Sequence, residues 1–137
     1  MPHKAHHGHV TVIPYSWGTF TPGAVTTNVR VGIPYNCKVM EISLSTASSA
    51  GGASRPTVQI TDGANNLLSG SATLTSGGTV VLTPTSSPSL VAAQRVRVRG
   101  NELQIQVTTV ASEAVVGFVC LIHVRADSHV PVSPADE

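Results

Sequence analysis

Apolar and polar residues alternate by twos along most of this chain, and no stretch shows a sustained helical period. The odd-numbered positions from Val25 to Ile33 share one face, and Pro34 ends that run because proline has no N–H for a sheet ladder. Further alternating runs, separated by turn residues, cover 39–44, 58–61, 79–83, 95–99, 102–110 and 115–125. About eight short strands at this spacing are typical of an antiparallel β-sandwich or barrel.

The strongest local pattern lies in 95–106, where Gly100-Asn101 has the chemistry of a two-residue hairpin turn. That turn sets Val98 opposite Leu103, and along both strands apolar residues meet apolar ones and polar residues meet polar ones. A slip of one residue destroys the match. We therefore expect an antiparallel hairpin whose two strands pair directly.

The run 115–125 is apolar on both faces. One face carries the alternate residues from Val116 to Val124, and the other carries Val115, Val119 and Leu121. A strand with two apolar faces must be covered on both, whereas a two-layer sandwich covers one. The second cover is either a loop or terminus of the same chain, or a neighbouring subunit.

The two ends of the chain differ from its middle. Residues 1–9 hold four of the six histidines, and 126–137 is polar, interrupted by proline and acidic at its close. We interpret 1–9 as an N-terminal arm, 10–125 as one β-sandwich domain and 126–137 as a C-terminal arm. The clustered histidines are His3, His6, His7 and His9. Without a fold to hold them they predict adventitious metal affinity rather than a metal site, and no cofactor is expected.

Composition narrows the function further. Charged residues make up 11% of the chain and its net charge is +1, so we expect no nucleic-acid partner. No apolar run approaches the roughly 18 residues of a membrane span, and the first residues lack the apolar core of a signal peptide, so we expect no membrane partner. Cys37 and Cys120 are too few for a disulfide framework and are expected to be buried free thiols, in a protein without an export signal.

Three arginines, Arg95, Arg97 and Arg99, alternate along one predicted strand and stand about 6.6 Å apart on one face. Such a ladder suits an acidic protein surface, a sulfated glycan or phosphates. The facing Glu102 and two glutamines suit a solvated outer face equally well, so both interpretations stay open.

Tyr15, Trp17 and Phe20 form an aromatic cluster in a chain with few other aromatic residues. Such a cluster packs in a core or an interface, or it stacks on sugar rings. The small number of aromatic residues favours packing.

No sequence motif for nucleophilic, metal-dependent or nucleotide-dependent catalysis occurs, and the acidic residues are scattered along the chain. We therefore expect a protein that is not an enzyme.

The whole chain resembles the capsid decoration, or cement, proteins of tailed bacteriophages. The likeness lies in its charge-poor composition rich in Ser, Thr, Val and Gly, in its terminal arms, and in Val58–Gly70 (VQITDGANNLLSG), which is similar to hairpins common in such structural proteins. The resemblance implies a jelly-roll-like β-sandwich on the outer surface of a virion, in a protein that is made in the host cytoplasm.

From these observations we expect a non-enzymatic structural protein that binds an assembled viral capsid and bridges neighbouring subunits of the major capsid protein, as a homodimer or homotrimer. The expected oligomer or capsid interface residues are Val115, Val119, Leu121, Arg95, Arg97, Arg99, Tyr15, Trp17 and Phe20. The rival hypothesis is a carbohydrate-binding or adhesive module, such as a fibre or receptor-binding domain. It requires Trp17 to be exposed beside its aromatic neighbours.

Overall fold

The computed structural model describes residues 10–23, 26–47, 55–74, 78–109 and 115–126, and these residues are almost entirely in strands, turns and loops. The strands are β1 (Val10–Phe20), β2 (Thr26–Gly32), β3 (Cys37–Ser45), β4 (Thr57–Thr61), β5 (Ala72–Thr73), β6 (Thr79–Leu82), β7 (Val96–Arg97), β8 (Glu102–Thr108) and β9 (Val115–Ala126). A short 3-10 helix, Ala92–Gln94, precedes β7.

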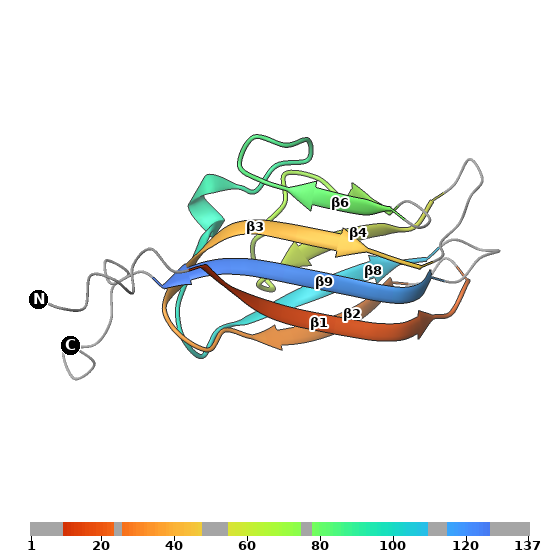
Figure 1. The fold of residues 1–137 in the computed structure, drawn as a ribbon, viewed down its shortest axis with the longest axis horizontal. Helices are drawn as coiled ribbons and strands as arrows, with labels where there is room; N and C mark the ends of the chain where they lie inside the picture. Colours follow the sequence, from red (N-terminus) through yellow and green to blue (C-terminus); the bar gives the residue numbers. More distant parts are fainter. Residues whose placement is uncertain (1–9, 24–25, 48–54, 75–77, 110–114, 127–137) are drawn as a thin grey trace, which may run out of the picture.

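The strands form two antiparallel sheets that pack face to face (Figure 1). The β9 sheet has the order β1-β9-β3-β6, with β7 paired to β3, and the β8 sheet has the order β2-β8-β4-β5. The chain therefore passes from one layer to the other at most of its connections, which is the arrangement of a jelly roll. The expected all-β sandwich is confirmed.

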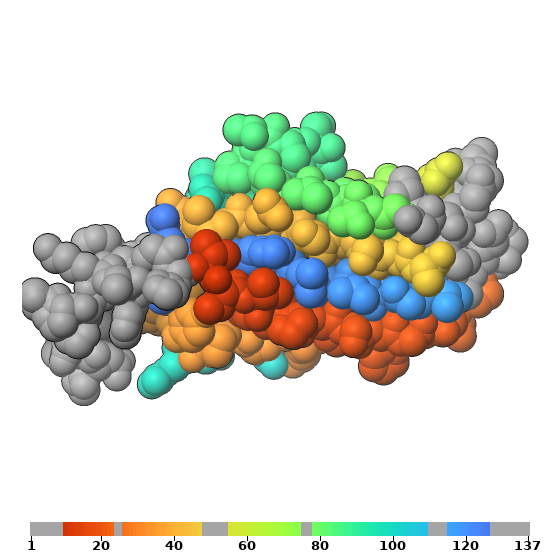
Figure 2. All heavy atoms as spheres, in the orientation of Figure 1, coloured from red at the N-terminus to blue at the C-terminus, as the bar shows by residue number. Residues whose placement is uncertain are grey.

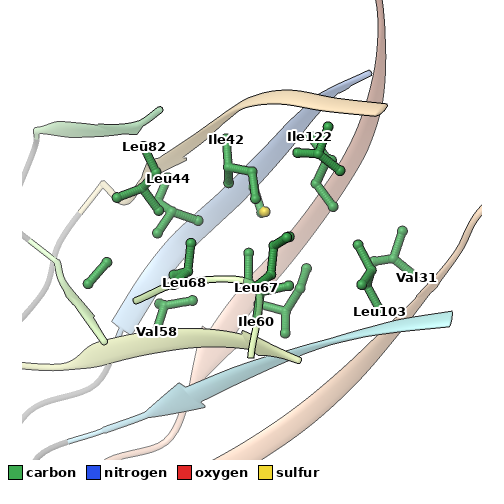
Figure 3. Packing of buried hydrophobic residues seen from close by; sticks show 14 of the residues in the cluster. Val31, Ile42, Leu44, Val58, Ile60, Leu67, Leu68, Leu82, Leu103 and Ile122 are labelled. Carbon is green, nitrogen blue, oxygen red and sulfur yellow. The ribbon is translucent and has the colours of Figure 1, made fainter. Parts of the chain in front are cut away.

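The core lies between the two sheets and follows from the alternation within each strand. In β8, Leu103, Ile105 and Val107 are buried, while the glutamines between them face outward. Figure 3 shows side chains from both sheets meeting, with Leu67 and Leu68 of the loop after β4 packed between them. The period of two thus places the apolar half of each strand in one shared core.

Strand β1 was not among the alternating runs, and its existence depends on a partner far away in the chain. It forms an edge of the β9 sheet and is mostly exposed, and it contains Pro14, which is tolerated on edge strands. Its pairing with β9 runs from Val10 opposite Arg125 to Phe20 opposite Val115. Residues 1–9 and 127–137, expected to be arms, lie outside the described residues.

The expected hairpin across 95–106 is wrong. β7 pairs with β3, and β8 pairs with β2 and β4, so the two strands belong to opposite sheets. A turn forms one residue earlier than expected, centred on Arg99-Gly100, because the Asn101 N–H donates to the Val98 carbonyl over 3.0 Å. The Gly100 N–H, however, donates to the Ile33 carbonyl over 3.1 Å, and the Ile33 N–H donates to the Asn101 carbonyl over 2.9 Å. These bonds hold the turn against the start of the β2–β3 connection, where the chain crosses between sheets.

Candidate functional site

The surface of the β9 sheet that faces away from the core carries a group of apolar residues among hydroxyl and charged ones. Residues paired side by side on it form rows, one of which runs from Pro14 to Leu121 to Ser43 to Val81. We call Val12, Pro14, Val81, Val119 and Leu121 the outer apolar face. Val12 is 44% exposed and Val81 46% exposed, and the others are exposed or half-buried. Figure 2 shows this side of the molecule, with β1, β9, β3 and β6 forming a continuous surface.

Charged groups on this side of the β9 sheet gather toward one end. Lys38 lies opposite Arg125 in the register, and one step further in, Glu41 lies opposite His123. The Nε2 atom of His123 is buried and has no hydrogen-bond partner among the residues that the structure describes. A buried polar atom without a hydrogen-bond partner is uncommon in native protein structures. Tyr15 Oη is the other buried side-chain atom without a hydrogen-bond partner in the described part of the chain.

The outward face of the β8 sheet has the opposite character. One row across it consists of threonines, and the next contains amide side chains; the residues are Thr26, Thr57, Thr73 and Thr108, then Asn28, Gln59 and Gln106. A surface ion pair joins Arg30 to Glu102 over 3.4 Å. One outer face of the sandwich is thus ordinary solvated surface, whereas the other exposes aliphatic side chains.

Two of the three expected interface residues on β9 lie on the outer apolar face, and one does not. Val119 and Leu121 point away from the core, but Val115 is fully buried, so its assignment to the outer face is wrong. The alternation changes phase at Gly117, whose φ of 67° a residue with a side chain rarely adopts. There the Ala47 N–H donates to the Val116 carbonyl over 3.0 Å, and Val116 itself is exposed.

The three arginines do not form a ladder, because β7 covers only Val96–Arg97. Arg95 turns back onto β3, where its Nε donates to the Val39 carbonyl over 2.9 Å. Arg99 is exposed, and its backbone N–H donates to Asn36 Oδ1 over 2.9 Å.

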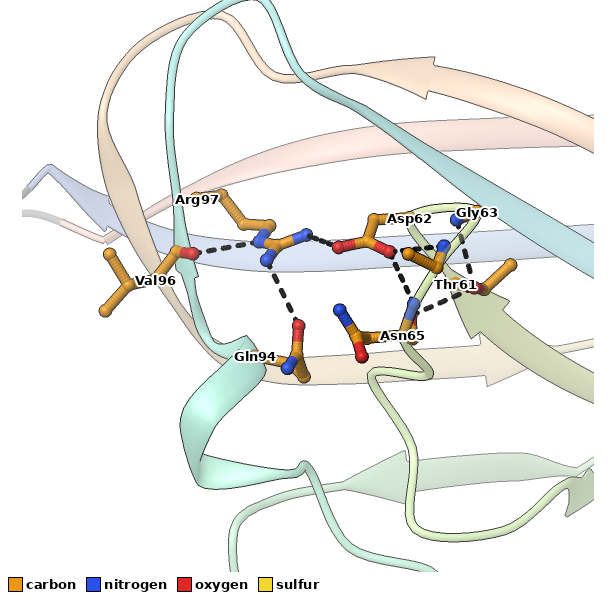
Figure 4. Close-up of polar contacts among 8 residues, drawn as sticks. Thr61, Asp62, Gly63, Asn65, Gln94, Val96 and Arg97 are labelled. Atoms are coloured by element: carbon orange, nitrogen blue, oxygen red, sulfur yellow. Dashed lines mark hydrogen bonds and ion pairs between the residues drawn. The ribbon is translucent and has the colours of Figure 1, made fainter.

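Arg97 instead belongs to a polar clamp that ties the loop after β4 to β7 (Figure 4). Its Nη1 contacts Asp62 Oδ2 over 3.2 Å, with the side chains 11% and 22% exposed. Its Nη2 donates to Gln94 Oε1 over 3.4 Å, and its Nε donates to the Val96 carbonyl over 2.9 Å. Every nitrogen of the guanidinium is therefore engaged within the protein.

Asp62 completes the clamp from its own loop. Its Oδ1 accepts hydrogen bonds from the Asn65 N–H (2.7 Å) and the Ala64 N–H (2.9 Å). These two bonds, with Arg97, hold the pKa of Asp62 below its ordinary value. A pocket of about 210 Å³ lies beside the clamp, and its other lining residues are Asn101 and Glu102. The charged groups beside this pocket, Asp62 and Arg97, pair with each other. The clamp is therefore best explained as an interaction that stabilises the fold.

The aromatic cluster is divided between core and surface. Phe20 is buried and meets Phe118 edge to face, with ring centroids 5.6 Å apart. Trp17 is 49% exposed, its Nε1 donates to the Thr19 carbonyl over 2.9 Å, and its ring lies nearly parallel to that of Tyr15 at 6.4 Å. Burial raises the pKa of Tyr15. Phe20 therefore packs the sandwich, whereas Trp17 remains on the open edge of β1.

Both cysteines are buried thiols that form no disulfide, as expected. They lie far apart along β3, since Cys37 itself faces Ala126 while Cys120 faces Leu44. Burial raises the pKa of Cys120 to about 12. The histidines of 1–9 lie outside the described part of the chain, within which no group of three metal-ligating side chains occurs. No helix in that part is long and apolar enough to cross a membrane.

No protein-family model and no curated protein matches this chain. Among solved structures, one chain of "Structure of infectious bursal disease virus Gx strain" is similar to it with a TM-score of 0.38 and 10% sequence identity. The match covers 89% of this chain and 33% of that chain, so this protein spans about a third of its length. At that level of similarity the match carries no conclusion about function.

Proposed function

We propose that this protein is a non-enzymatic structural protein of a virion, which binds the outside of an assembled capsid and stabilises it by bridging neighbouring capsid subunits. The observation that carries the proposal is the outer apolar face. Apolar residues grouped on the surface of a sandwich are typical of a site that binds another protein. The resemblance to capsid decoration proteins supplies the kind of partner, the major capsid protein.

The fold supports bridging in a second way. Val10, the first residue of β1, lies opposite Arg125 near the end of β9 (Figure 1), so the flanking segments 1–9 and 127–137 start at the same end of the sandwich. Segments that start side by side are suited to reach two neighbouring subunits. Stabilisation follows from mass action, because a ligand that binds only the assembled shell lowers its free energy by RT ln(1 + [L]/Kd) per site. Repetition over a symmetric surface multiplies the effect.

The test is addition of the purified protein to capsids that lack it. We expect saturable, stoichiometric binding and a higher temperature of capsid disruption. Deletion of 1–9 or of 127–137 is expected to weaken binding while circular dichroism shows the sandwich still folded. Normal binding by both deletion variants would exclude bridging by these segments, and no binding by the full chain would exclude the proposal.

Carbohydrate binding remains a second candidate because Trp17 is exposed next to a parallel Tyr15 ring. Saturable binding to a glycan array that Trp17→Ala abolishes would favour this function. Val96→Ala, which changes another exposed apolar residue, is the matched control. Under the capsid proposal, neither the parent protein nor the Trp17→Ala variant binds the glycan array.

A further inference from the structure

We infer that the capsid surface that receives the outer apolar face carries carboxylate side chains, and that these bind Lys38 and Arg125 at one end of that face. This inference rests on the proposed function and names the chemistry of the partner at the same site.

The two cations belong to one row across four strands. Arg125 lies between Val10 and Lys38, and Lys38 lies between Arg125 and Val96. We call these four residues the basic row. Val10 is 51% exposed and Val96 is 40% exposed, whereas the two cations are half-buried and alternate with core residues along their strands. The row is continuous with the outer apolar face, because Val12 follows Val10 on the same side of β1.

This arrangement places two like charges side by side. Residues directly opposite in an antiparallel pair have their Cβ atoms about 5 Å apart, and like charges at that separation repel each other. Neither Lys38 nor Arg125 forms an ion pair with a carboxylate of the residues that the structure describes. The acidic residue of β3, Glu41, is one row further in and lies opposite His123. A carboxylate from a partner would relieve the repulsion and accept charge-assisted hydrogen bonds from both cations.

The residues beside the two cations distinguish between kinds of anion. A phosphate or sulfate group would balance the charges, but it would leave the exposed Val10 and Val96 in water. A protein surface offers carboxylates and aliphatic side chains together, so it can cover the whole basic row. The chain also has a net charge of only +1, which gives it little general attraction to polyanions. These observations favour an acidic patch on a protein.

The experiment measures the binding of charge variants to capsids that lack this protein. Lys38→Glu and Arg125→Glu are each expected to raise the dissociation constant at least about 10-fold, because a carboxylate then faces the carboxylates of the capsid. Each variant places opposite charges side by side within the row, so folding is not impaired. Arg55→Glu is the matched control: it makes the same change of charge at an exposed arginine before β4, in the other sheet, and should change binding less than about 2-fold.

Salt gives a second readout of the same contact. Raising the salt concentration from about 0.05 M to about 0.5 M is expected to weaken binding of the parent protein at least about 10-fold, because ions screen the charges. The double variant Lys38→Met and Arg125→Met should weaken less than about 3-fold over the same range, because its contact with the capsid is mainly aliphatic.

The segment 127–137 is the rival source of carboxylates, since it contains Asp127, Asp136 and Glu137. Urea unfolding of the full chain without capsids distinguishes it from the capsid. We expect Lys38→Met to keep or raise the urea midpoint, because the substitution removes the repulsion from Arg125. A lower midpoint would show that the chain itself already pairs with Lys38, and it would overturn the inference.

Two further results overturn the inference. One is capsid binding by the parent protein that neither charge reversal nor salt weakens, which leaves the proposed function standing. The other is retention on heparin at about 0.15 M salt that Lys38→Glu removes, which would identify sulfate or phosphate groups as the ligand. A parent protein that does not bind capsids even at low salt refutes the proposed function, and this inference with it.

Discussion

Replacing Asp62 tests whether the clamp between the loop after β4 and β7 stabilises the sandwich. Asp62→Ala removes the two backbone hydrogen bonds at Oδ1 and the ion pair with Arg97. By analogy with helix caps, the backbone bonds contribute about 1 kcal/mol. The ion pair contributes about 1 kcal/mol more, discounted for screening because water reaches the carboxylate. We therefore expect the free energy of unfolding in urea to fall by about 2 kcal/mol.

Asp62→Asn separates the two contributions, because an amide oxygen still accepts from the Ala64 and Asn65 N–H groups but carries no charge. It is expected to cost about 1 kcal/mol. Combined with Arg97→Met it should cost no more than Arg97→Met alone, because the pair is then already broken. Additive losses in this double-mutant cycle, or an Asp62→Ala variant within 0.5 kcal/mol of the parent, would refute the assignment.

The acid dependence gives an independent measure of the same clamp. The pKa of Asp62 is lower in the folded protein than in the unfolded chain. Its stabilisation is therefore complete above the unfolded value of about 3.9 and is lost as the pH falls through the lowered folded value. Asp62→Asn should flatten the loss of stability below about pH 4. An unchanged acid profile would contradict the assignment.

Three further predictions test the fold and its core. Gly117→Ala should lower the free energy of unfolding by about 1–2 kcal/mol, because the φ of Gly117 is 67° and a new Cβ would lie 3.0 Å from Ala47 Cβ. Gly18→Ala is the control: a Cβ there has no atom within 4 Å, so the same urea titration should show no change. Phe118→Ala should cost about 3–5 kcal/mol and Trp17→Ala less than about 1 kcal/mol, because only the first opens a cavity; equal losses would contradict the burial. Cys120 should resist Ellman's reagent at pH 8 until urea unfolds the chain, because burial raises its pKa to about 12, and rapid labelling of the native protein would show an open core.

Local alternation predicted most of the strands because each has one buried and one exposed face. In β8 the buried Leu103 and Ile105 alternate with glutamines, and a short stretch of sequence is enough to show this alternation. The apolar outer positions of β9 were visible for the same reason, and Val119 and Leu121 do point outward. Their role in an interface stays a prediction.

Long-range pairing could not be predicted from local pattern. β1 is a strand because β9 lies beside it, about a hundred positions later in the chain. The regular apolar and polar matching in 95–106 holds for a hairpin, but it does not exclude two strands that pair with different neighbours. Arg97 finds Asp62, 35 positions earlier, through the crossing of the chain between sheets. The phase change at Gly117 depends on a backbone conformation that glycine permits but does not dictate.

The position of β9 between β1 and β3 has a consequence for synthesis on the ribosome. Among the described strands β9 is translated last, so β1 and β3 have no common partner until residues 115–126 have left the exit tunnel. Until then the strands β1 and β3 lack the neighbour that β9 supplies, and their core-facing side chains stay exposed to solvent. A product stopped before residue 115 loses the organisation of its first strand along with its last, and such fragments are a source of aggregates rather than of partly functional protein.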